Sequence, residues 1–211
     1  MHLSFEILKA LPKPHCLSPT LNFLVQVHYL GKELLDSALL KVLVMIDPKI
    51  KDYSLSEVKR VERRFGPPDS LNNILWCEKM LLLNRTNSIQ TVDLPIEIKE
   101  DHESAIWYYF SSLEGGEIFL KFFFSGICYL LAEDKITVRS IPWSSECSYL
   151  LPYDIWKETI YRYYPDSLWI RLDHSLYGRL QDYQLSNGLP SLQTALERLL
   201  DKEQTETRRI V

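Results

Sequence analysis

The stretch TLNFLVQVHYLGKELLDSALLKVLVMI, residues 20–46, is the part of the chain that decides its fold class. Apolar side chains occupy every second position over residues 21–29, and again over residues 40–46. A period of two is typical of a β-strand that buries one face. Gly31 and Lys32 interrupt the pattern where a turn is expected. The stretch therefore predicts two successive antiparallel strands.

Strand patterns also occur outside this stretch. Residues 3–7 and 92–98 alternate in the same way, and Pro95 indicates an edge strand because proline cannot donate a hydrogen bond to a sheet. Residues 74–83 are largely apolar. Residues 117–131 are apolar on both faces, which is typical of a central strand, or of two strands bent at Gly126.

Short helices are predicted between the strands. SLSE, residues 54–57, has the pattern of a capping box at a helix start. A repeated strand–helix–strand pattern is absent, which argues against a parallel sheet. The sequence thus predicts an α+β fold: mainly an antiparallel β-sandwich or curved sheet of about eight strands, with short inserted helices and a C-terminal helical segment.

The character of the chain changes at residue 142. Pro152 suits the first turn of a helix, and apolar residues recur at helical spacing over residues 192–200. We expect a single domain over residues 1–200, with a β-rich part (1–141) packed against a C-terminal helical segment (142–200). The polar residues 201–211 are expected to form a flexible tail.

Composition restricts the classes of partner. The chain has 211 residues and a net charge of −4, which gives no overall preference for nucleic acid. No apolar run approaches the roughly 18–20 residues that a membrane span needs. The four cysteines lack a C-x-x-C spacing and favour free thiols in a reducing compartment. We therefore expect a cytoplasmic protein with no nucleic-acid or membrane partner, and the oligomeric state stays open.

Catalytic and metal-binding motifs are not recognisable. Neither G-x-G-x-x-G nor G-x-x-x-x-G-K occurs, and no histidine or cysteine pairs have the spacing of a zinc site. Asp173 and His174 are adjacent, but adjacent residues do not face each other on a helix or a strand. Asp173 is better explained as a helix cap. We predict no catalytic residue, no metal ligand and no cofactor.

Aromatic residues are concentrated near the C-terminus. Three of the five tryptophans and seven of the twelve tyrosines lie in residues 143–183. Such rings can attach helices to a sheet, form a protein-binding surface, or stack against sugars or bases. The candidate binding residues are Trp143, Tyr153, Trp156, Tyr163, Tyr164, Trp169 and Arg171.

Several short motifs carry a family resemblance. They are GEIFL (116–120), FSG (124–126), PW (142–143), LP (151–152) with Trp156, YPDS (164–167) with Trp169, and RL (171–172). Together they resemble the signature of an uncharacterised bacterial domain of unknown function from actinobacteria and cyanobacteria, over about residues 5–200. The resemblance implies no assigned cofactor or catalytic residue. Some members are encoded near nickel–iron hydrogenase genes, which implies an accessory or assembly role.

Three functions follow as hypotheses. The leading one is a non-enzymatic protein-interaction or accessory protein that binds its partner through the aromatic C-terminal segment. The second is an enzyme of unrecognised type, with a pocket where His174 or another titratable residue meets a carboxylate. The third is a β-sandwich that binds carbohydrate or another small ligand through exposed rings.

Overall fold

The computed structural model describes residues 2–99, 104–133, 135–167 and 170–210. The chain divides into two compact units, Met1–Ser167 and Leu168–Val211. In the described residues, the first unit contains the strands together with helices α1, α2 and α3, and the second contains helices α4 and α5.

The smaller sheet of the first unit has the strand order β1-β2-β5, with β1 at His2–Pro12, β2 at Thr20–Leu30 and β5 at Ile89–Glu97. Both pairings are antiparallel. Pro95 lies in β5, at the edge of the sheet, so the edge position predicted from its missing N–H is confirmed.

The larger sheet has the order β4-β3-β6-β7, again antiparallel, with β4 at Ile74–Leu83, β3 at Leu34–Ile46, β6 at Glu117–Ala132 and β7 at Lys135–Pro152. Strand β6 is central and continuous. It has a register shift at Gly126, where a Cβ atom would collide with the carbonyl oxygen of Leu39. Glycine is therefore required where β6 approaches β3 most closely.

The main hydrophobic core lies between the two sheets. Phe5 of β1 stacks on Phe124 of β6, with ring centroids 4.0 Å apart. Phe23 of β2 packs edge-on against Phe122, at 5.3 Å. All four rings are buried. The predicted α+β fold is confirmed; the described residues form seven strands, which lie in two sheets.

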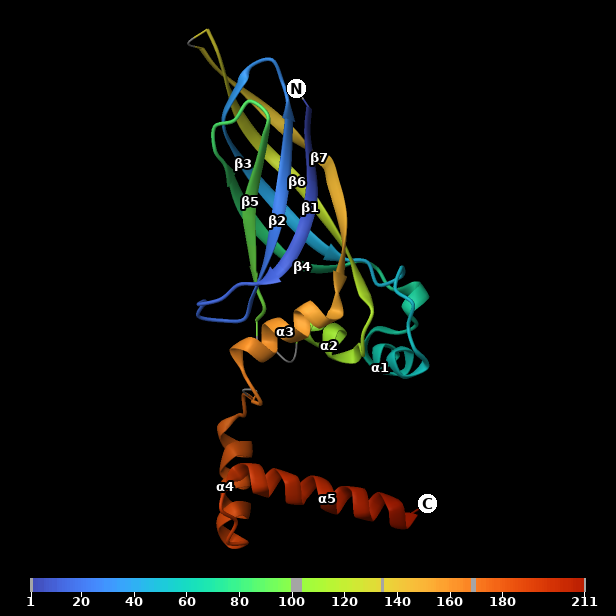
Figure 1. Cartoon of the computed structure of the whole chain (residues 1–211). Coiled ribbons are helices and arrows are strands. Elements are labelled where there is room, and N and C mark those ends of the chain that lie inside the picture. Colours follow the sequence, from blue (N-terminus) through green and yellow to red (C-terminus); the bar gives the residue numbers. More distant parts are fainter. Residues whose placement is uncertain (1, 100–103, 134, 168–169, 211) are drawn as a thin grey trace. The chain divides into compact units, whose positions relative to one another are not determined.

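Three helices gather at one end of the two sheets (Figure 1). They are α1 (Leu55–Phe65), α2 (Ala105–Ser112) and α3 (Tyr153–Tyr163), and a short 3-10 helix, η1 (Pro68–Ser70), follows α1. The predicted capping box at α1 is present. The boundary at residue 142 is wrong, because β7 stays paired with β6 as far as Pro152 and the helical part begins only at Tyr153.

The second unit contains α4 (His174–Ser186) and α5 (Leu192–Ile210). The side chain of Asp173 accepts a hydrogen bond from the Leu176 N–H at 2.8 Å, so its predicted role as a helix cap is confirmed. Helix α5 continues through the expected tail as far as Ile210. None of the helices within the described residues combines the length and the apolar character needed to cross a membrane.

Candidate functional site

Two of the candidate aromatic residues belong to the core. Tyr153 and Trp156 of α3 are buried. Trp156 stacks on Phe110 of α2, with centroids 4.9 Å apart and an interplanar angle of 13°, and meets Trp107 edge-on at 5.6 Å. Tyr153 stacks on Trp156 at 5.7 Å. We call Trp107, Phe110, Tyr153 and Trp156 the ring cluster; it attaches α3 to α2.

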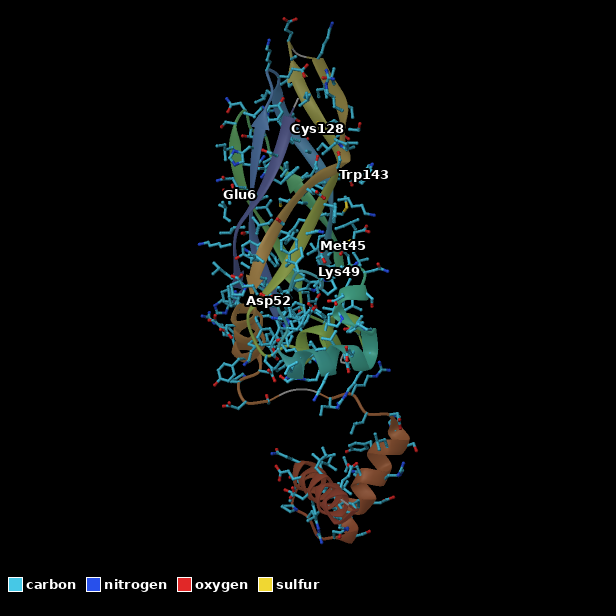
Figure 2. The ribbon with its side chains drawn as sticks, turned by 90° about the vertical axis from the view of Figure 1, so that its right-hand side faces the viewer. Glu6, Met45, Lys49, Asp52, Cys128 and Trp143 are labelled. Atoms are coloured by element: carbon cyan, nitrogen blue, oxygen red, sulfur yellow. The ribbon has the colours of Figure 1, made fainter. Side chains whose placement is uncertain are left out.

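The other candidates lie apart from the ring cluster. Tyr163 and Tyr164, at the end of α3, are half-buried and touch edge-on at 4.7 Å. Trp143 is 78% exposed and lies where β7 bends (Figure 2). Trp169 falls outside the described residues, and Arg171 is an exposed residue of the second unit. A single binding surface made of all seven residues stays a prediction.

A different surface carries most of the exposed apolar area of the sheets. On the side of the four-stranded sheet that faces away from the core, Leu39 of β3 lies opposite Leu82 of β4 and Ile127 of β6. Further apolar side chains continue this row along all four strands, and their exposed fractions lie between 38% and 62%. We call this surface the apolar outer face: Leu39, Leu75, Met80, Leu82, Ile127, Ile136, Val138 and Leu150.

The charges on this side of the sheet are balanced. Lys41 pairs with Glu78 across β3 and β4 at 2.8 Å, and Lys121 of β6 pairs with Asp47 at 2.7 Å. Both Lys41 and Glu78 are about half exposed, so the pair contributes little to stability. Side chains of both signs thus lie among the apolar ones, and neither sign dominates.

The hairpin of β6 and β7 enlarges the apolar outer face. Its turn extends beyond the other strands, at the end of the sheets away from the helices (Figure 1). Ile136 and Val138 of this hairpin lie level with the start of β3, and are 62% and 59% exposed. The backbone there is nevertheless fully paired, with Ile136 opposite Leu131 and Val138 opposite Tyr129. The hairpin therefore presents its apolar side chains on an ordered strand pair.

The corresponding face of the three-stranded sheet is polar in its central rows. Asn22 of β2 donates a hydrogen bond to Asp93 of β5 at 2.7 Å, and Gln26 and His28 are hydrogen-bonded at 2.9 Å. Exposed Leu30 and Ile89 lie at strand ends, and Leu8 and Leu11 of β1 are 44% and 43% exposed. One sheet thus has an outer face suited to water, whereas the other has an apolar face that no helix or strand within the described residues of the first unit covers (Figure 1).

The helical end of the first unit contains a buried ionic network. Lys51 Nζ lies 3.7 Å from Glu57 Oε1 and donates a hydrogen bond to the Gly115 carbonyl at 2.6 Å. The backbone N–H groups of Glu114 and Ser54 each donate to the Glu57 carboxylate at 2.8 Å. Burial acts to raise the pKa of Glu57, but these donors and Lys51 outweigh it and lower the pKa below its ordinary value of 4.5.

Two tyrosine hydroxyls form a second buried group near this network. Tyr53 donates to the Pro48 carbonyl at 2.7 Å and is hydrogen-bonded to Tyr109 at 2.8 Å. Burial raises the pKa of Tyr53 to about 12 and also raises that of Tyr109. Both tyrosines are thus neutral at physiological pH, and their partners are protein groups of the loop and of α2. The two groups together hold the loop after β3 against α1 and α2.

Among the cavities formed by the described residues of the first unit are the following three. One, of about 270 Å³, lies beside the ring cluster and is lined by Cys77, Lys79 and Lys99 among others. One of about 460 Å³ lies between the β1–β2 loop and α3, beside His15 and Arg162. The third, of about 370 Å³, lies between β1 and β7. Within the described residues, no three His, Cys, Asp or Glu side chains come together as metal ligands.

Comparison with known proteins identifies the family. Residues 1–208 match the family described as "Family of unknown function (DUF6084)", and the chain belongs to this family. No curated protein matches it. Crystal structures of beta-glucosidase from Kluyveromyces marxianus, one in complex with glucose, match at 15% and 10% identity with TM-scores of 0.28 and 0.26. Each match covers 71% of this chain, and the chain spans 15% of the length of that enzyme.

The apolar outer face was overlooked in the sequence because its signal was assigned to burial. Residues 117–131 are apolar on both faces of the strand, which is also typical of a strand buried on both faces. The distinguishing feature lies in β3 and β4, where Lys41 and Glu78 interrupt the outward-facing leucines. A charged pair in the middle of an apolar face indicates contact with water.

Proposed function

We propose that this member of the DUF6084 family is a non-enzymatic protein-interaction or accessory protein of the bacterial cytoplasm, and that its partner binds the apolar outer face. The single observation that carries the proposal is the exposure of that face on a well-packed sheet. Monomeric soluble proteins seldom expose a contiguous apolar surface of this size unless it binds something.

The area of the face suits a protein partner. Four strands about 4.8 Å apart, with about 3.3 Å per residue along the 13 residues of β3, give a sheet face of about 600 Å², which includes the paired charges. Association with a flat partner surface of the same size would bury about 1,200 Å² in total, which is at the lower end of specific interfaces. A small ligand would instead need a concave site.

The charges of the face define the chemistry of the partner. Lys41 and Lys121 are balanced by Glu78 and Asp47, to which they are paired. A strongly charged partner would gain no net attraction from such a surface. The partner surface is therefore expected to be apolar and close to neutral, and to belong to a folded protein that can lie flat against four strands.

Affinity capture with matched variants tests this proposal. The full chain is used as bait in a lysate of its source organism, beside the variant Leu82→Glu/Ile127→Glu and the control Gln26→Glu/Thr91→Glu on the other sheet. The proposal expects a stoichiometric protein that the wild type and the control retain and that the apolar-face variant loses by at least tenfold. Equal retention by all three baits, or a face used only for self-association in light scattering, would overturn it.

The family resemblance suggests one identity for the partner. If the protein assists hydrogenase assembly, the protein retained by the apolar outer face would be a hydrogenase subunit or maturation protein. The same capture experiment tests this by mass spectrometry of the retained band. A partner from an unrelated process would leave the interaction role standing and remove the hydrogenase role.

A further inference from the structure

The edges of the two sheets meet along β1 and β7, which are end strands in their respective sheets. Toward the helical end, side chains join the two strands. The backbone N–H of Ala10 donates to the Tyr149 hydroxyl at 3.1 Å, and the backbone of Ile7 is hydrogen-bonded to the Cys147 sulfur. Farther from the helices the strands are separated by the cavity of about 370 Å³, which is lined by residues 3–5 of β1 and by residues 141, 142 and 144–146 of β7.

The backbone of β1 has free hydrogen-bonding groups in this gap. In an antiparallel pair, alternate residues direct both N–H and C=O away from the partner strand. Ile7 directs its backbone toward β7, since it contacts Cys147 there. Phe5 and Leu3 follow at intervals of two and remain in regular register with β2. Their N–H and C=O groups therefore point into the gap, where a further strand could pair with them.

The opposite wall of the gap is a bulge in β7. Ile141 pairs with Gly126 and Ser145 with Phe124, so Pro142, Trp143 and Ser144 stand opposite one residue of β6. Because of this bulge, the edge of β7 that faces β1 does not present its backbone groups at the regular spacing of a strand. β7 thus cannot itself supply the missing ladder to β1 at this point.

The side chains around the gap define which peptide it would take. Phe5, whose ring stacks on the buried ring of Phe124, and buried Ile141 form an apolar floor. Glu6 of β1, labelled in Figure 2, and Glu146 of β7 lie on the outside, since they alternate with core-facing neighbours in their strands. Burial is the main cause of the raised pKa of Cys147, and both carboxylates lie close enough to add to it. An added strand would direct alternate side chains to the floor and to the two carboxylates.

We propose that this gap binds an extended peptide segment of a partner protein, with alternating apolar and basic residues, as a further strand beside β1. Peptides commonly add to exposed sheet edges in this way. The occupant is not a second copy of this chain, because the same edge of a second copy would bring its own Glu6 and Glu146 against these carboxylates. The proposal needs none of the residues of the apolar outer face, although Glu146 stands opposite Phe123 on the same side of β7 and so borders that face.

The probe that tests this is a synthetic peptide of alternating valine and lysine, blocked at both ends. The controls are a peptide of the same composition in two blocks and an alternating valine–glutamate peptide. The full chain is expected to bind the first peptide at least tenfold more tightly than either control. On binding, amide hydrogen exchange at Leu3 and Phe5 is expected to slow.

Charge variants give the second arm of the test. Glu6→Lys/Glu146→Lys is expected to weaken binding at least tenfold, whereas Glu62→Lys, an exposed glutamate on α1, is expected to leave it unchanged. Circular dichroism checks that both variants are folded. Equal binding of the block peptide, exchange protection located away from β1, or unchanged affinity in the double variant would each overturn the proposal.

Discussion

The ring cluster and the apolar outer face are both rich in large apolar side chains, yet their environments are opposite. The rings of Trp156 and Phe110 stack inside the helical end of the first unit, whereas Leu82 and Met80 are exposed on a sheet. Aromatic residues are enriched at interfaces, and this property alone favours the first region as the binding surface. Residue type alone therefore indicates that a side chain makes a contact. It does not tell whether that contact lies inside the protein or with a partner.

The largest expected effect is on stability, in the ring cluster. Trp156→Ala removes a buried ring that contacts α2, and is expected to lower the free energy of unfolding by about 4 kcal/mol. Trp143→Ala removes an exposed ring and is expected to change it by less than about 0.5 kcal/mol. Urea denaturation of both full-length variants measures the difference. Similar losses in the two would mean that the contrast in burial is wrong.

A smaller loss is expected from the backbone beneath the apolar outer face. Gly126→Ala places a Cβ against the Leu39 carbonyl and forces β6 away from β3, at a cost of about 2–3 kcal/mol. Gly115→Ala meets open space and serves as the matched control. Thermal unfolding of the two variants compares them. If Gly126→Ala and Gly115→Ala unfold at the same temperature, the close approach of β6 to β3 does not require a glycine.

The buried network at the helical end predicts a pH dependence. Since the folded state lowers the pKa of Glu57, its contribution is present above the ordinary value of 4.5 and is lost as pH falls through the lower, folded value. Glu57→Gln is expected to cost about 1–2 kcal/mol at neutral pH. The difference in stability between this variant and the wild type should shrink as pH falls below 4.5. Glu62→Gln, on the same helix but exposed, should follow the wild type throughout.

The smallest effect on stability is expected at the apolar outer face itself. Leu82→Gln/Met80→Gln alters side chains that are already 61% and 59% exposed, and should change the free energy of unfolding by less than about 0.5 kcal/mol. Binding of a hydrophobic dye to the folded protein should nevertheless fall several-fold. The matched variant Leu30→Gln, at a strand end of the other sheet, should retain the dye. A large loss of stability would show that the face is internal.

Much of the fold could be predicted from local patterns. The period of two in β2 and β3, the missing N–H of Pro95 and the capping box at Ser54 each depend on neighbouring residues only, so one sequence suffices to read them. The number of sheets could not be predicted in the same way. It depends on which strands pair, and β3 pairs with β6 across the 70 residues of chain between Ile46 and Glu117.

The candidate site shows the same limit. Tyr153 and Trp156 were selected for their residue type, and only the position of α2 against α3 reveals that they are internal. The apolar outer face depends on residues from four strands, so no single segment of the sequence reveals that it is exposed on the first unit. The break at residue 142 was misjudged because proline and tryptophan there are typical of a loop, whereas β7 accommodates them as a bulge.

The balanced charges of the apolar outer face have a kinetic consequence. With no net field to guide a partner, association should proceed without electrostatic steering, at about 10⁵–10⁶ M⁻¹ s⁻¹, and should change little with salt concentration. The gap flanked by Glu6 and Glu146 should behave in the opposite way, capturing a basic segment faster at low ionic strength. The two surfaces would then respond to different conditions on one sandwich, and the ionic strength would decide which one a partner reaches first.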